Sequence, residues 1–269
     1  MLHETECVID IEQLKRHAKS VVIEGHRGGK FEYDNTMAAF HKAVEHGLKS
    51  VEFDVWLTQD KVPIVIHGGL AGEIEHACPH LGITETTLIN DIPLDHIKQI
   101  VLPKGERIPT LEELIDEFHG KVVFNCEVKE TNPEFAQILI DLLLDREITE
   151  GFVVSSFLDK QLDLIGSLAQ EQGLNLTIAY GYEFIDTMQP DEYLRTGDII
   201  TFDYKCMTPD LVNRIHRANK KTSCYFYPAS DETDETYPKV MAAGIDIVIT
   251  DRPLQLRKYL NELESANHN

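Results

Sequence analysis

The stretch VEFDVW, residues 51–56, has the alternation of apolar and polar side chains that is typical of a β-strand. Its valines and phenylalanine would lie on one face, and Glu52, Asp54 and Trp56 on the other. In an antiparallel sheet such an acidic face usually points to solvent. In a parallel sheet covered by helices, the two carboxylates need a partner or a function. The kind of sheet around this strand therefore decides what the pair does.

Short apolar runs alternate with longer segments of helical periodicity along the chain, as in repeated strand–helix units. The predicted strands lie at residues 21–23, 51–56, 121–128, 151–155, 175–180, 198–202, 221–226 and 245–249. The predicted helices lie at residues 35–46, from 110, at 133–146, 158–171, 209–218, 234–243 and from 253. Eight strands in a chain of 269 residues predict an α/β fold, a TIM (β/α)8 barrel that forms a single domain of residues 1–269.

Residues 58–108 interrupt this alternation. The apolar run at 62–66 follows a tight turn at Gln59-Asp60, which is too short to join parallel neighbours. We therefore predict that 62–66 runs antiparallel to the strand before it. Residues 58–108 would form a small cap, inserted between the second barrel strand and its helix, near the C-terminal rim. That helix has the clearest predicted start, because Thr110 and Glu113 have the spacing of a capping box.

Acidic residues outnumber basic ones by 46 to 25, which gives a formal charge of −21. This charge would repel nucleic acids and anionic membrane surfaces, so we expect no nucleic-acid partner. A phosphate site would need local Arg, Lys or a bound cation. The first ten residues lack the features of a signal peptide, and no run approaches 18 apolar residues. We expect a cytoplasmic protein without stable membrane insertion.

The strand at 121–128 adds a third acid, because Asn125, Glu127 and Lys129 would share one face. Glu127 would join Glu52 and Asp54, whose Cα atoms should lie roughly 6–7 Å apart. Three carboxylates suit Mg²⁺ or Ca²⁺ better than Zn²⁺. An internal ion pair between Glu127 and Lys129 is the alternative for this strand. With both strands considered, we predict a site for one divalent cation, Mg²⁺ or Ca²⁺.

Two histidines end strands at glycine-rich bends: His26 before Arg27-Gly28-Gly29, and His67 before a second pair of glycines. A histidine at a strand end is more often structural than catalytic. A catalytic role for the two histidines is better supported when the carboxylates and the cations Arg27 and Lys129 are considered with them. Phosphoryl transfer needs charge neutralisation, an activated nucleophile and a protonated leaving group, and these residue types supply each. The set predicts cleavage of a small-molecule phosphodiester.

Aromatic side chains near strand ends are candidates for a substrate pocket, although such residues more often pack in the core or at the rim. The candidates are Trp56, Phe157, Phe202, Tyr204 and Tyr225.

Several sequence blocks, in order along nearly the whole chain, resemble those of the glycerophosphodiester phosphodiesterase family. The N-terminal blocks are HRGG (26–29), NTMAAF (35–40), EFDVWLTQD (52–60) and PIVIH (63–67). The later blocks are PTLEEL (109–114), NCEVK (125–129), SSF (155–157) and TDRP (250–253). The resemblance implies a TIM barrel with an inserted cap, a divalent cation held by the three carboxylates, proton transfer by the two histidines, and phosphate contacts from Arg27 and Lys129.

The implied reaction is metal-dependent hydrolysis of glycerophosphodiesters to an alcohol and glycerol 3-phosphate. Its implied course is attack by the glycerol 2-hydroxyl, departure of the alcohol and hydrolysis of a cyclic phosphate. A lysophospholipase D-type phosphodiesterase and a non-catalytic phosphodiester-binding barrel are the alternatives. An apolar surface on residues 69–105 would favour the lipid substrate, with candidates Leu70, Ile74, Leu81, Ile83, Leu88 and Ile89. A missing ligand or histidine would favour the non-catalytic barrel.

Three positions depart from the family pattern. Asp34 stands where the family has Glu before Asn-Thr, and Gly68 stands where an Asp usually follows the histidine. Residues 224–228 replace a Trp-Thr-Val-Asn block near the seventh strand. The predicted ligands and histidines are intact, so these departures bear on the shape of the substrate.

Overall fold

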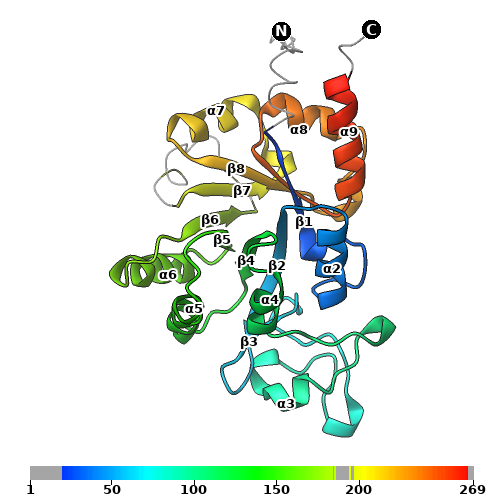
Figure 1. Cartoon of the computed structure of the whole chain (residues 1–269), viewed down its shortest axis with the longest axis vertical. Helices are drawn as coiled ribbons and strands as arrows, with labels where there is room; N and C mark the ends of the chain where they lie inside the picture. The colour runs from blue at the N-terminus through cyan, green and yellow to red at the C-terminus, as the bar shows by residue number, and fades with distance from the viewer. Residues whose placement is uncertain (1–19, 184, 186–193, 195–196, 266–269) are drawn as a thin grey trace.

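A computed structural model describes residues 20–183, 185, 194 and 197–265, and its parallel strands close into a barrel (Figure 1). The eight barrel strands are β1 (Val22–Gly25), β2 (Ser50–Leu57), β4 (Val123–Val128), β5 (Phe152–Ser156), β6 (Thr177–Tyr182), β7 (Ile199–Asp203), β8 (Lys221–Tyr225) and β9 (Ile247–Thr250). Each strand pairs in parallel with the next, and β1 pairs with both β9 and β2. The predicted TIM barrel is confirmed.

Helices cover the outside of the barrel (Figure 1). They are α2 (Met37–Glu45), α4 (Leu111–Phe118), α5 (Glu134–Asp145), α6 (Asp159–Glu171), α7 (Pro209–Arg217), α8 (Tyr237–Ala243) and α9 (Pro253–Ser265). The capping box of α4 is confirmed, since Thr110 Oγ1 accepts from the Glu113 backbone N–H and the Glu113 carboxylate accepts from the Thr110 N–H. The N-terminal residues that bear on the signal peptide lie outside the described residues.

Helix α2 begins at Met37, two residues later than the sequence predicted. Asn35 has a left-handed backbone (φ 58°), which asparagine tolerates better than most residues. Thr36 is the N-cap, and its hydroxyl accepts from the Ala39 N–H at 3.3 Å. The late start leaves the Asn35 side chain free to reach into the barrel.

The two faces of β2 have different surroundings. Val51, Phe53 and Val55 are buried among apolar side chains of the covering helices. The inward face is polar from the bottom of the barrel upward: Glu24 accepts hydrogen bonds from Ser50 Oγ and Asn125 Nδ2, both at 2.6 Å. Burial raises the pKa of the Glu24 carboxyl. A polar interior of this kind supports a site at one barrel mouth.

The inserted segment adds β3 (Pro63–Val65), which pairs antiparallel with the end of β2, as predicted. It also contains α3 (Leu94–Ile97) and the short 3-10 turns η2 (Pro79–Leu81), η3 (Ile89–Asp91) and η4 (Pro103–Gly105). Figure 1 shows this cap, drawn mainly in cyan, beside the end of β2. Its side chains form their own core of mostly isoleucines: Ile64, Ile66, Ile74, Cys78, Ile83, Ile89, Ile92, Ile97, Ile100, Leu102 and Ile108.

The cap presents little of the apolar surface considered for a lipid substrate. Ile74, Ile83 and Ile89 lie in the cap core. Leu81 packs against that core, and only Leu70 and Leu88 of the six candidates are exposed. The reason is that a segment of some fifty residues needs its apolar side chains to hold itself together. Among the described helices, none has the length and apolarity needed to cross a membrane.

Candidate active site

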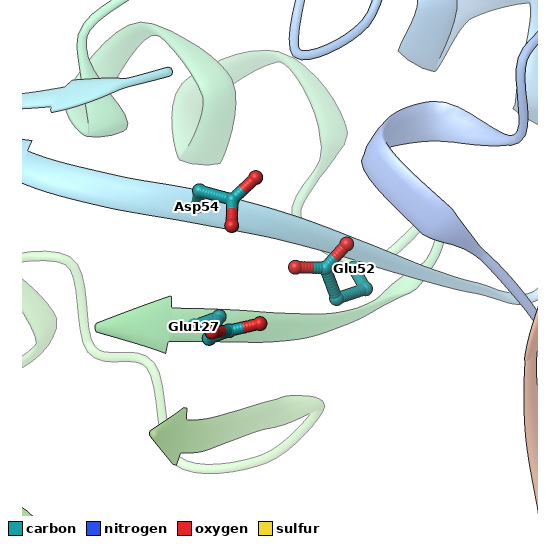
Figure 2. Close-up of side chains that lie close together, drawn as sticks. All are labelled: Glu52, Asp54 and Glu127. Carbon is teal, nitrogen blue, oxygen red and sulfur yellow. The ribbon is translucent and has the colours of Figure 1, made fainter. Parts of the chain in front are cut away.

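Three carboxylates lie side by side at the C-terminal end of the barrel (Figure 2). Glu52 and Asp54 come from β2, and Glu127 comes from β4, where it is the register partner of Asp54. One oxygen of each carboxylate lies within 4.8 Å of those of the other two. Glu52 and Asp54 are each only 1% exposed. This spacing lets all three groups contact a single cation.

The three carboxyl groups of the cluster differ in the direction in which their pKa is shifted. Burial, together with the charges of Asp54 and Glu127, raises the pKa of Glu52 well above its usual value. Burial also raises the pKa of Glu127. Asp54 is buried too, but the charges of Lys129 and Arg27 outweigh burial and hold its pKa below the usual value. Glu52 Oε1 is buried without a hydrogen-bond partner among the described residues. A hard divalent cation would satisfy that oxygen and offset the repulsion, so the residues present fit such an ion.

Two cations flank the acids. Arg27 Nε lies 3.2 Å from Asp54 Oδ2, and its backbone N–H donates to Glu52 Oε2 at 3.0 Å. Lys129 Nζ lies 3.2 Å from Asp54 Oδ1 and also pairs with Glu127. The ion pair named as an alternative for β4 is therefore present, within a larger group. Burial alone would lower the pKa of both cations, but the nearby carboxylates raise it, so both side chains stay charged.

His26 lies at the other side of the cluster, in the turn after β1. Its Nδ1 is 2.6 Å from Asp251 Oδ1, and its Nε2 is 3.9 Å from Glu52 Oε2. The backbone N–H of Asp251 donates to Glu232 Oε2 at 2.9 Å. Burial alone would raise the pKa of Asp251, but the hydrogen bond from His26 lowers it. The Asp251 carboxylate is therefore ionised and accepts a hydrogen bond from His26 Nδ1–H. Nε2 is thus the nitrogen that faces the acids.

His67 is held at the cap side by Trp56, whose indole N–H donates to the His67 carbonyl at 2.8 Å. The glycines around it allow this contact: a Cβ on Gly72 would lie 2.9 Å from the Trp56 ring, and one on Gly68 3.1 Å from Trp56 Nε1. Gly68 has a positive φ of 69°. The departure from the family pattern at this position therefore accompanies a tight turn. Burial and the neighbouring cations lower the pKa of His67 to about 4.

Replacing Trp56 by phenylalanine should lower kcat about tenfold, because a smaller aromatic ring remains while the hydrogen bond that holds the His67 carbonyl is lost. Steady-state kinetics on a glycerophosphodiester, the substrate that the family resemblance implies, would measure the effect. The matched control is Tyr227→Phe, which removes a polar group from an exposed ring at the cavity rim. Equal kcat values for wild type and Trp56→Phe would show that this contact does not position His67.

A cavity of about 730 Å³ opens above the cluster. Its lining includes His26, Arg27, Glu52, His67, Glu127 and Lys129 on the side of β1 to β4. Thr201, Asp203 and Tyr225 line the cavity from β7 and β8, and Phe157, which follows β5, has Lys129 Nζ 5.9 Å from its ring centroid. The cavity lining thus brings together predicted site residues from six segments of the chain, at 26–27, 52–56, 67, 127–129, 157 and 225.

Of the candidate aromatic residues, Trp56, Phe157 and Tyr225 line the cavity. Phe202 does not: it is 0% exposed and lies in the core between the barrel and its helices. Its strand neighbours Thr201 and Asp203 point into the barrel, so alternation sends Phe202 outward. The prediction for Phe202 was wrong. Tyr204 also lies outside the lining and packs on Phe226 with ring centroids 5.1 Å apart.

Sequence reasoning missed several residues of the site. Asn35 donates its amide N–H to Asp54 Oδ2 at 2.9 Å, and Asp251 contacts His26. Both belong to the blocks that carried the family resemblance, which was the available signal. Thr201 and Asp203 had a weaker signal, a polar alternation inside an apolar strand. Asp34, the shortened family acid, pairs with Lys30 at the rim.

The structure is thus a closed eight-stranded barrel with buried carboxylates, two cations and two histidines at one mouth. A family model described as the glycerophosphoryl diester phosphodiesterase family matches residues 26–255. The chain belongs to this family, and it is a glycerophosphodiester phosphodiesterase.

Known proteins similar to the chain agree with this assignment. A glycerophosphodiester phosphodiesterase from Caldanaerobacter subterraneus subsp. tengcongensis is 27% identical over 87% of this chain and 95% of its own length. A crystal structure of a putative glycerophosphodiester phosphodiesterase from Galdieria sulphuraria superposes with a TM-score of 0.79 at 20% identity, covering 90% of this chain and 98% of that one. An Oleispira antarctica phosphodiesterase in complex with the product sn-glycerol-3-phosphate has a TM-score of 0.75 at 21% identity, covering 91% and 98%. These structures share the fold.

Proposed function

We propose that the chain hydrolyses glycerophosphodiesters to an alcohol and glycerol 3-phosphate, in a reaction that requires Mg²⁺ or Ca²⁺. The observation that carries the proposal is the buried group of Glu52, Asp54 and Glu127, in which Glu52 Oε1 has no hydrogen-bond partner among the described residues, at a cavity that both histidines line. The presence of sn-glycerol-3-phosphate as the product in the related Oleispira antarctica protein supports the choice of product.

Arg27 and Lys129 are the groups that would bind the phosphate. Both line the cavity, both stay charged, and both already neutralise Asp54. An anionic phosphodiester entering a protein of charge −21 needs this local positive charge. When bound by the three carboxylates, the divalent cation would add charge neutralisation at the phosphoryl oxygens.

The two histidines would move the protons. The glycerol 2-hydroxyl attacks phosphorus and loses its proton to one imidazole, while the departing alcohol oxygen takes a proton from the other. Water then opens the cyclic phosphate, and the two imidazoles exchange roles. His26 suits such a task because Asp251 holds its Nδ1 and leaves Nε2 facing the acids. His67 suits it because Trp56 fixes its backbone at the rim.

The two alternatives are less well supported. A lysophospholipase D-type reaction would need an apolar surface for an acyl chain, and most of the cap's apolar side chains are buried in the cap core. A non-catalytic barrel would lack a ligand or a histidine, whereas here the three carboxylates form one cluster and both histidines line the cavity.

Metal removal tests the proposal. Hydrolysis of glycerophosphocholine and glycerophosphoethanolamine should proceed with Mg²⁺ or Ca²⁺, stop in EDTA and return when the cation is restored, because the acids then regain their counter-charge. Release of glycerol 3-phosphate, measured with an enzyme-coupled assay, is the readout. The thermal midpoint should rise with the cation, as for any ligand that binds only the folded state. Activity that persists in EDTA would contradict the proposed role of the cation.

A further inference from the structure

The cavity is electrostatically asymmetric. Among the described lining residues, Arg27 and Lys129 carry the only permanent positive charges, and both belong to the side of β1 to β4. The acidic lining residues outside the carboxylate cluster are Glu183, Asp203, Glu232 and Asp251. Glu232 and Asp251 are engaged elsewhere, since Glu232 accepts from Tyr237 and the Asp251 N–H, and Asp251 binds His26. Glu183 and Asp203 therefore remain to act on a substrate.

Asp203 is the better placed of the two, because it is 7% exposed and stands at the end of β7. Its Oδ1 accepts from the Lys205 backbone N–H at 2.8 Å. The Lys205 ammonium lies instead against Asp231 Oδ2 at 2.8 Å and the Tyr227 carbonyl at 2.6 Å. Within the described residues, no cation forms an ion pair with the Asp203 carboxylate; the Lys205 ammonium, whose pKa is raised by Asp231 and also by Asp203, pairs with Asp231 instead. A buried carboxylate at a cavity wall without a cationic partner attracts one from a ligand.

Aromatic rings adjoin this carboxylate. Tyr225 is the register partner of Asp203 on β8, and its ring meets that of Phe157 edge-on at a centroid distance of 5.7 Å. Aromatic faces bind ammonium groups through their negative quadrupole. Below them, the Thr201 hydroxyl is buried, faces the cavity and has no hydrogen-bond partner among the described residues. Phe157, Thr201, Asp203 and Tyr225 are called the acidic wall below.

We infer that the acidic wall receives the leaving alcohol and favours one that carries an ammonium group, an inference that rests on the proposed function. The glycerol arm is uncharged in every glycerophosphodiester, so a negative wall can discriminate only through the other arm. Asp203 and the ring of Tyr225 supply attraction for the cation, while the ring of Phe157, which already has Lys129 Nζ 5.9 Å from its centroid, packs edge-on against Tyr225. The protein's charge of −21 acts in the same direction, because a zwitterionic phosphodiester is repelled less than an anionic one.

The test compares glycerophosphocholine with its uncharged isostere, in which a 3,3-dimethylbutyl group replaces choline. The two substrates match in shape and differ in the ammonium charge. With Mg²⁺ or Ca²⁺ present, kcat/KM for the choline ester should exceed that for the isostere by about tenfold or more. Asp203→Asn should bring this ratio close to one. Tyr225→Leu should reduce it as well, and serves if the first variant folds poorly, which its thermal midpoint would reveal.

The matched control is Glu235→Gln, which also removes one negative charge near the rim but lies on an exposed loop outside the cavity lining. Its ratio and rates should equal those of wild type. A wild-type ratio near one with both esters hydrolysed would overturn the inference and leave the proposed function standing. So would an equal loss of preference in Glu235→Gln and Asp203→Asn, which would assign the preference to the general charge. Hydrolysis of neither ester would overturn the proposed function and the inference with it.

Discussion

Replacing Glu52 by glutamine should reduce the hydrolysis of glycerophosphocholine by about a thousandfold, since loss of the cation removes several kcal/mol of charge stabilisation. The change keeps the size of the side chain and preserves an oxygen for the Arg27 N–H, which now donates to Glu52 Oε2 at 3.0 Å. Mg²⁺ and Ca²⁺ should no longer raise the thermal midpoint. Initial rates across a range of cation concentrations, together with thermal unfolding, measure both effects.

The same substitution should stabilise the cation-free protein. Burial and two neighbouring carboxylates raise the pKa of Glu52 in the folded chain, so its ionisation destabilises the fold as pH rises through that pKa. Glutamine cannot ionise, and its advantage in EDTA should be larger at about pH 8 than at about pH 5. Glu134→Gln, at an exposed position on α5, is the control and should show no such gain. A lower thermal midpoint in EDTA for Glu52→Gln than for wild type would mean that repulsion among the three carboxylates does not destabilise the fold.

Replacing His26 by alanine should lower kcat by about a thousandfold, within the range of 10²–10⁴ expected when a general acid or base is removed. Cation binding should persist, because the three carboxylates remain and the cation should still raise the thermal midpoint. This combination separates loss of proton transfer from loss of the cation site. His67→Ala should behave in the same way if the two imidazoles share the task.

The control for both histidine variants is His96→Ala, since His96 belongs to the cap helix α3 and lies outside the cavity lining. It should keep the wild-type kcat. Full activity in His26→Ala would rule out proton transfer by this residue. A loss of the thermal response to Mg²⁺ in His26→Ala would instead assign the histidine to the cation site.

Local signals in the sequence were sufficient for the barrel. Alternation along 51–56 predicted that the two acids of β2 share a face, and the short turn at Gln59-Asp60 predicted the antiparallel β3. Residue spacing likewise predicted the capping box at Thr110. These predictions succeeded because strand periodicity, turn length and helix capping depend on residues within a few positions of one another.

Several features that depend on distant residues were not predicted. Phe202 was expected in the pocket, but the inward direction of β7 is set by closure of the barrel, which turns Thr201 and Asp203 inward instead. Asn35 was expected inside a helix, and its left-handed backbone becomes understandable only from its hydrogen bond to Asp54. From the sequence, the apolar residues of the cap could form either a lipid-binding surface or a core. In the structure most of them pack in a core.

The sequence by itself determined that this chain is an eight-stranded barrel with acids, histidines and cations at strand ends, because those properties follow from local periodicity and from short blocks that resemble one family. Only the tertiary structure decided which of these groups meet. Asp251 contacts His26 across 225 positions of sequence because β9 pairs with β1 when the barrel closes. The same closure sets Asp203 and Tyr225 opposite Arg27 and Lys129. Closure of a barrel depends on contacts between residues far apart in the sequence, and it sets the side of the cavity on which each charge lies.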